Sequence, residues 1–97
     1  MQTRAGCAYG AAMARYLVES FIPRARTGDA AAITARLRDE AERLTSRGTP
    51  VRLVQAIFVP DDEICFSLYE SMSVDLVVEV SRRAELSCER VVEAVVR

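Results

Sequence analysis

The fold is decided by one stretch, Val51-Arg-Leu-Val-Gln-Ala-Ile-Phe-Val-Pro-Asp-Asp-Glu-Ile-Cys-Phe-Ser-Leu-Tyr-Glu70. Residues 51–59 and 63–70 are rich in the β-branched and aromatic side chains that favour strands. Between them, Pro60-Asp-Asp62 predicts a turn, because proline fixes φ and aspartate hydrogen-bonds to nearby backbone. The stretch therefore predicts an antiparallel hairpin.

One strand and one helix are predicted on each side of this hairpin. Residues 15–22 read as a strand that stops at Pro23, and residues 29–47 as a helix that ends at Gly48. After the hairpin, Ser71 or Ser73 can cap a helix over 74–84, and residues 90–96 form a last strand. Helical crossovers around a hairpin predict an α+β, ferredoxin-like βαββαβ fold with strand order 4-1-3-2 and both helices on one face of the sheet.

The alternation of side chains predicts which residues face the helices. A sheet covered on one side alternates between buried and exposed positions, and the third strand shows the clearest pattern. We expect these side chains under the helices: Ile64, Phe66, Leu68, Val18, Ile22, Val54, Phe58, Val92, Ala94 and Val96.

The other face is predicted to be apolar as well. It would carry Leu17, Glu19, Phe21, Leu53, Gln55, Ile57, Cys65, Ser67, Tyr69, Val91, Glu93 and Val95. Burial of ~600 Å² of apolar area is worth roughly 15 kcal/mol before association costs. We therefore expect a second copy to pack sheet against sheet in a two-fold homodimer. The alternative is that the first helix or the N-terminal segment folds over this face.

A few polar groups on that second face are the candidate site residues. Glu19 and Glu93 lie on neighbouring strands and are the candidate metal ligands, because two buried carboxylates need a cation, a proton or hydrogen-bond donors. Apolar walls with a few polar groups are typical of ligand pockets, so we take four residues as candidate ligand contacts: Gln55, Cys65, Ser67 and Tyr69. The alternative places both acids near strand ends, solvated or paired with arginine.

Glu70 is assigned a structural role. It belongs to the register predicted to face the helices and ends its strand just before the second helix. We expect it to cap that helix or to interact with the helix dipole rather than to take part in catalysis.

Composition excludes several classes of function. The 97 residues carry 13 basic and 14 acidic side chains, so the net charge of −1 lacks the basic excess of a nucleic-acid binder. Every cation is arginine, and histidine is absent. The chain therefore lacks the commonest general base and transition-metal ligand, and every Ser-His or Cys-His nucleophile pair.

Cysteines and leader sequence indicate the compartment. Cys7, Cys65 and Cys88 form no CxxC pair and are odd in number, which predicts thiols in a reducing cytosol. The start lacks the apolar region of a signal peptide, and no apolar run approaches the ~20 residues that span a bilayer. We expect a cytoplasmic protein without membrane contact, with a loose extension over 1–12 before a domain over 13–97. Met13 is an alternative start.

Five runs resemble a known family: Tyr16-Leu-Val-Glu-Ser-Phe-Ile-Pro23, Gly48-Thr-Pro-Val51, Phe58-Val-Pro-Asp-Asp-Glu-Ile-Cys-Phe-Ser-Leu-Tyr-Glu70, Arg82-Arg-Ala84 and Arg90-Val-Val-Glu93. The family is a small actinobacterial one, described as a domain of unknown function and as "nickel-responsive protein". The resemblance covers residues 13–96 and implies a ferredoxin-like homodimer that forms an α/β barrel, with nickel binding. Nickel prefers imidazole and thiolate, so without histidine this chain is expected to offer nickel or another divalent metal at most a weak oxygen-rich site.

Three hypotheses of function follow. The first is a non-enzymatic dimeric binding protein with a metal or small-ligand cavity between the two sheets. The second is a cofactor-independent dimeric-barrel enzyme, similar to monooxygenases or isomerases, with Glu19, Glu93 or Tyr69 as its acid or base. The third, an interaction module on the arginine face of the first helix, is disfavoured because acidic residues interleave there. No catalytic motif is present, so binding is favoured over catalysis.

Overall fold

The central hairpin forms as predicted. β2 (Val51–Val59) and β3 (Ile64–Ser71) pair in antiparallel fashion and are joined by a 3₁₀ turn, η3 (Pro60–Asp62). Glu63 closes the turn in the left-handed region with φ 55°. The structure is a computed structural model that describes residues 13–97, so the extension predicted over 1–12 lies outside the described residues.

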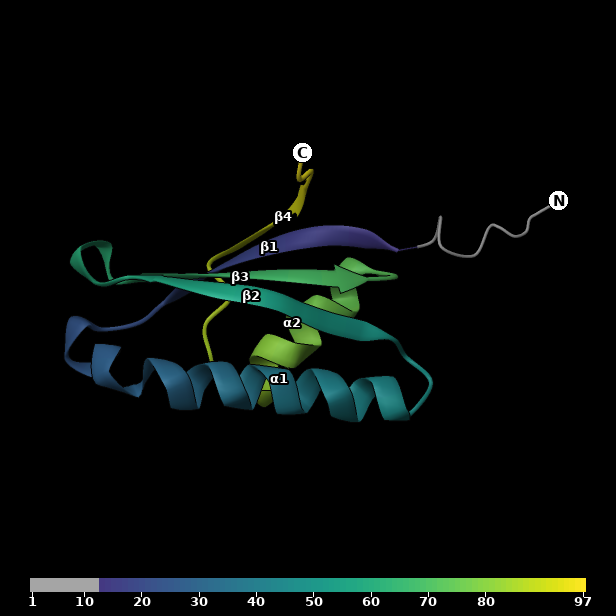
Figure 1. Cartoon of the computed structure of the whole chain (residues 1–97), viewed down its shortest axis with the longest axis horizontal. Helices are drawn as coiled ribbons and strands as arrows, with labels where there is room; N and C mark the ends of the chain where they lie inside the picture. The colour runs from purple at the N-terminus through teal and green to yellow at the C-terminus, as the bar shows by residue number, and fades with distance from the viewer. Residues whose placement is uncertain (1–12) are drawn as a thin grey trace, which may run out of the picture.

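The four strands lie in the order β2-β3-β1-β4, and all three pairings are antiparallel. β1 (Ala14–Phe21) lies between β3 and β4 (Arg90–Ala94). The order of elements is β-α-β-β-α-β, and both helices cover the same face of the sheet (Figure 1). The predicted α+β, ferredoxin-like architecture and its strand order are confirmed.

The two helices have clear sequence-encoded ends. α1 (Ala30–Ser46) follows a short 3₁₀ segment, η2 (Arg24–Asp29), and stops before Gly48, which has a φ of 90°. α2 (Val74–Arg83) is capped by Ser73, whose hydroxyl accepts a hydrogen bond from the Leu76 amide at 3.4 Å. Within residues 13–97, neither helix has the length and apolar character needed to cross a bilayer.

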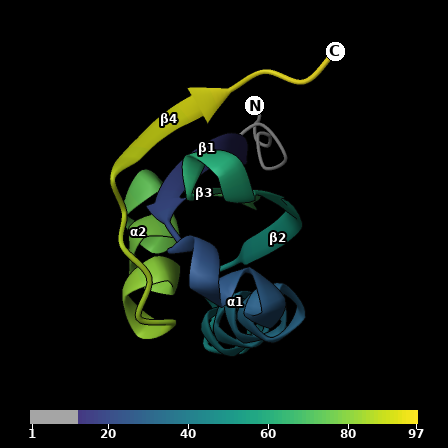
Figure 2. The same ribbon diagram turned by 90° about the vertical axis from the view of Figure 1, so that its left-hand side faces the viewer.

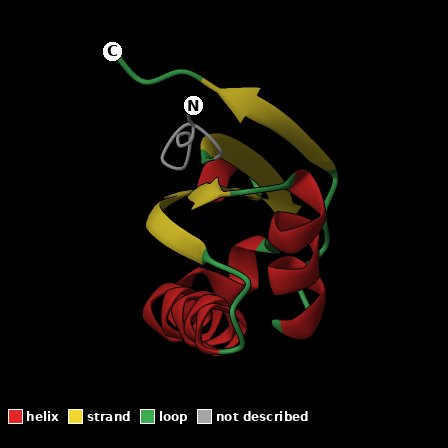
Figure 3. Cartoon of the chain, turned by 90° about the vertical axis from the view of Figure 1, so that its right-hand side faces the viewer, coloured by secondary structure: helices red, strands yellow, loops and turns green. Residues whose placement is uncertain are grey.

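The core lies between the helices and the sheet. α1 contacts mainly β2, whereas α2 contacts β3 and β1, and the side views show the two helices next to each other on one side of the strands (Figures 2 and 3). An ion pair of 3.0 Å between Arg83 of α2 and Glu40 of α1 joins the two helices. The buried apolar side chains are Val18, Ile22, Ile33, Leu37, Ala41, Leu44, Val51, Leu53, Cys65, Tyr69, Val77, Val80 and Ala84.

The predicted face assignment is correct for β1 and wrong for β3. Val18 pairs with Ser67 and is fully buried, so Ser67 and its same-side neighbours Cys65 and Tyr69 lie under the helices. The larger apolar set predicted there, Ile64, Phe66 and Leu68, faces the other way and is only partly buried. The small Cys and Ser side chains leave room beneath the helices for the Tyr69 ring, which hydrophobicity alone does not indicate.

The assignment is also wrong for β4 and for the start of β2. Val91 pairs with Val18 and packs against the core, so Val92 and Ala94 lie on the uncovered face, while Val96 lies beyond the end of the strand. In β2 the register shifts between Leu53 and Gln55, and this bulge reverses the alternation. Leu53 is therefore 4% exposed under the helices, Val54 lies within the bulge, and Phe58 packs on the core as predicted.

Candidate functional site

The uncovered side of the sheet, called the open face below, carries a broad apolar surface. The register places the following side chains on it: Leu17 and Phe21 of β1, Ile57 and Val59 of β2, Ile64, Phe66 and Leu68 of β3, and Val92 and Ala94 of β4. Phe21 is 49% and Ile57 48% exposed. An apolar uncovered face is thus present, although several of its members differ from the predicted ones. Exposed apolar surfaces of this kind usually mark a site that binds a protein, a ligand or a membrane.

A row of charges crosses one end of the open face. Glu70 of β3 lies directly between Arg15 of β1 and Arg52 of β2 in the strand register. Its carboxylate accepts hydrogen bonds from both guanidinium groups, with N–O distances of 3.1 Å to Arg15 and 2.7 Å to Arg52. We call these three residues the basic end, because two cations share one anion. Glu70 therefore does not cap α2, contrary to the sequence-based expectation; Ser73 does.

Glu70→Gln is expected to weaken the acid dependence of stability. The bonds to Arg52, and then to Arg15, hold the pKa of Glu70 below its ordinary value of 4.5 although burial opposes this. A lowered folded-state pKa contributes stability that is present above the unfolded-state pKa and is lost as the pH falls through the folded-state pKa. The wild-type chain should therefore exceed the variant in stability at neutral pH, and this difference should shrink as the pH falls below 4.5.

Denaturant midpoints measured across the acid range check this prediction. Glu42→Gln is the matched control, since Glu42 is exposed on α1 and has no ion pair within residues 13–97. A stability difference between wild type and Glu70→Gln that stays constant from neutral pH to acid would contradict the proposed role of the arginines.

The opposite end of the sheet is acidic. The end of β1, the η3 turn and the residue before β4 contribute five carboxylates, which we call the acidic end: Glu19, Asp61, Asp62, Glu63 and Glu89. Arg24 pairs with Asp61 at 2.7 Å and Arg90 with Glu19 at 3.4 Å. A hollow of about 260 Å³ lies among four of these acids, Phe21, Ile64 and Ser20. The open face is therefore apolar in its middle and oppositely charged at its two ends.

The predicted carboxylate pair does not form within one subunit. Glu19 lies on the open face and bonds to Arg90, whereas Glu93 pairs with Tyr16 in the register of the covered face. The error follows from the inverted β4 assignment. Within residues 13–97 no group of three or more Cys, Asp or Glu side chains is placed to hold a metal ion. The residues described do not fit the nickel that the family resemblance implies.

Three of the four predicted ligand contacts come together, but on the covered side. Cys65, Ser67 and Tyr69 are buried on β3, with 3.7 Å between the Cys65 Sγ and the Ser67 Oγ. Burial raises the pKa of the Tyr69 hydroxyl and of the Cys65 thiol, and in each case the neighbouring Ser67 hydroxyl opposes the shift in part. These groups form a polar part of the core, and only Gln55 faces the open side.

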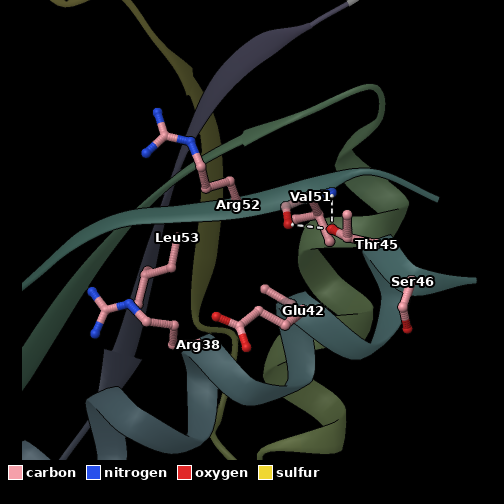
Figure 4. Close-up of a pocket in the computed structure, with 8 residues that line it drawn as sticks. Arg38, Glu42, Thr45, Ser46, Val51, Arg52 and Leu53 are labelled. Carbon is pink, nitrogen blue, oxygen red and sulfur yellow. Dashed lines mark hydrogen bonds between the residues drawn. The ribbon is translucent and has the colours of Figure 1, made fainter. Parts of the chain in front are cut away.

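Sequence reasoning missed a groove between α1 and the edge strand β2. The groove has a volume of about 490 Å³, and Arg38 and Glu42 rise into it from α1 (Figure 4). At its end the Thr45 hydroxyl accepts a hydrogen bond from the Val51 amide at 3.1 Å and donates one to the Val51 carbonyl at 2.8 Å. This hydroxyl thus satisfies backbone groups that an edge strand leaves without a partner. The predicted strand order, with β2 at an edge, is the signal that could have located the groove.

Thr45→Val is expected to lower the free energy of unfolding by about 1 kcal/mol, because both hydrogen bonds to Val51 are lost while the shape of the side chain is kept. Chemical denaturation measures the loss. Thr34→Val is the matched control, since its hydroxyl bonds only within α1. Equal stability losses in the two variants would show that pairing with the strand contributes nothing.

No family model, no curated protein and no solved structure matches this chain. The resemblance to the nickel-responsive family stays a prediction.

Proposed function

We propose that this chain is a small non-enzymatic binding protein that acts as a homodimer. Two copies pack open face against open face and enclose a chamber for a small, mainly apolar molecule. The observation that carries this proposal is the open face itself, where large apolar side chains from all four strands remain uncovered.

The size of this surface favours a second copy as its partner. An interface that a sheet forms with its own copy needs no other component, and two-fold dimers are the commonest assemblies. Phe21 and Ile57 are each about half exposed, although neither lies in a loop. Two such faces would lie opposite each other like the inner faces of a two-sheet sandwich.

The lining of the chamber indicates the class of ligand. The middle of the open face is apolar around Leu17 and Leu68, with Gln55 as its polar group. The Arg15–Glu70–Arg52 row lies toward one end, and the Glu19–Arg90 pair lies next to Phe66 toward the other. Apolar walls with few polar groups bind apolar molecules and orient them through one or two hydrogen bonds. We therefore propose an uncharged, mainly apolar ligand.

The geometry disfavours the enzymatic alternative. Its candidate acid and base groups are separated, since Tyr69 is enclosed on the covered side and Glu19 is bonded to Arg90 on the other. The geometry disfavours a metal ligand as well, because Glu19 and Glu93 lie on different faces.

Binding of Nile red, an uncharged apolar dye, tests the proposal. Saturable binding below ~100 μM dye is expected for the dimer. Leu68→Gln, inside the chamber, should weaken binding, whereas Val78→Gln, on the exposed side of α2, should not. An intact dimer that binds no dye, or binds it equally well in both variants, would overturn the chamber. Calorimetric titration with nickel should give no binding heat. Tight nickel binding would contradict the proposal of an uncharged, apolar ligand.

A further inference from the structure

The charges at the two ends of the open face determine how two copies fit together. We infer that the two sheets pack with their strands antiparallel, so that the basic end of each copy lies against the acidic end of the other. This inference rests on the homodimer proposed above and specifies its geometry.

The two ends differ strongly in charge. At the basic end, Arg15 and Arg52 share the single carboxylate of Glu70, and the Arg52 side chain remains 62% exposed. At the acidic end, five carboxylates face only Arg24 and Arg90, and neither Asp62 nor Glu89 has an ion pair within residues 13–97. The nearest members of the two ends, Arg15 and Glu19 on β1, are four residues and about 13 Å apart. This exceeds the ~8 Å screening length at physiological salt, so each end interacts only with what lies opposite to it.

Two aligned packings of the sheets are compatible with a two-fold axis. If the axis runs along the strands, the strands are parallel and the acidic ends of both copies come together. If the axis runs across the strands, they are antiparallel and each acidic end meets a basic end. Like charges placed opposite each other weaken an interface, and complementary charges fix its register. The charges therefore select the axis across the strands, even with the ≈ 30° rotation usual for packed sheets.

The antiparallel arrangement also shapes the chamber. The middle of β1 in one copy lies over the middle of β1 in the other, so the apolar surface around Leu17 and Leu68 is doubled at the centre. Both mouths of the chamber then carry opposite charges from the two copies. A ligand would thus enter past a charged rim and rest on an apolar centre.

Reversing charge at the acidic end gives opposite results for the two packings. With Asp62→Arg and Glu89→Arg combined, the antiparallel dimer should dissociate about tenfold more readily, because two cations then face the basic end. A parallel dimer would instead become tighter, because repulsion between its acidic ends is relieved. Asp39→Arg combined with Glu42→Arg is the matched control, with the same change in net charge on the exposed side of α1. A tighter dimer, or an effect equal to the control, would overturn the inference.

Cross-linking gives an independent readout of the geometry. Met13 directly precedes β1 and Phe21 is the last residue of β1; both are exposed, and neither belongs to a charged end. Met13→Cys and Phe21→Cys chains, each in a Cys7→Ser and Cys88→Ser background, are treated with a short bismaleimide reagent. The buried Cys65 is retained. The antiparallel dimer should cross-link only in the mixture, as a heterodimer of the two variants.

The outcomes distinguish this inference from the function on which it rests. Efficient cross-linking of either variant alone, or no cross-link in a mixture that sediments as a dimer, overturns the antiparallel packing and leaves the homodimer standing. A mixture that sediments as a monomer overturns the homodimer itself.

Discussion

Phe66→Arg is expected to separate the two subunits. Phe66 lies on β3, between the middle of the open face and its acidic end, opposite Glu19 of β1 and Ile57 of β2. In the proposed dimer a guanidinium group at this position is taken out of water between two apolar faces, and the adjacent Glu19, already paired with Arg90, offsets only part of a cost of several kcal/mol. We expect the dissociation constant to rise on the order of a hundredfold or more, as for other buried interface residues.

Sedimentation equilibrium over a range of chain concentrations measures this effect. Val78→Arg is the control, because Val78 is an apolar residue, 37% exposed, that lies on α2 and not on the open face. Ile57→Arg is the second variant, since Ile57 is 48% exposed and its replacement leaves the core of one subunit intact. A Phe66→Arg chain that is folded, by circular dichroism, and still dimeric would contradict an interface on the open face.

Leu37→Ala should cause the largest loss of stability. Leu37 is fully buried at the centre of α1, against the sheet. Removal of a buried leucine side chain loses its transfer free energy and leaves a cavity, for a cost of about 3–4 kcal/mol. Small domains have free energies of unfolding of about 5–15 kcal/mol, so this single change removes a large part of the stability.

Chemical denaturation at one fixed chain concentration measures the loss, because association with a second copy stabilises the folded state by an amount that rises with the logarithm of the concentration. Val78→Ala is the matched control, with methyl groups removed from an exposed position on the other helix; its cost should stay below about 0.5 kcal/mol. A loss of under about 1 kcal/mol for Leu37→Ala would mean that α1 does not pack on the sheet as described.

The order and type of the elements could be predicted because local signals mark their ends. The Pro60–Asp62 turn, the Gly48 stop and the Ser73 cap are each read from a few neighbouring residues. The strand order then follows from general rules of connection rather than from any single residue. Local signals and the rules of chain connection therefore predicted the same order of elements that the structure has.

The faces of the strands could not be predicted in the same way. Both sides of the sheet carry apolar side chains, so alternation in β3 did not show which set would be covered, and the larger set proved to be uncovered. The bulge between Leu53 and Gln55 reversed part of β2, and no glycine or proline marks it. Because successive residues point to opposite sides, each such error moves a whole strand from one face to the other.

The wrong face assignments also made the prediction of the candidate site wrong. Glu19 and Glu93 were paired only because β4 was assigned the wrong face, and Cys65, Ser67 and Tyr69 were placed in the open only because β3 was. The row formed by Arg15, Glu70 and Arg52 depends on two strand registers at once, and no spacing in the sequence reveals it. The existence of an apolar open face was nevertheless predictable, since either assignment leaves many large side chains uncovered.

The proposed function depends on a second copy that covers the open face, and the mass of the chain in solution tests this most directly. Sedimentation equilibrium of the full chain at micromolar concentration should give twice the monomer mass of 10.7 kDa. A species that stays at 10.7 kDa up to ~1 mM would mean an interface weaker than about 4 kcal/mol, and would contradict a dimer built on this face.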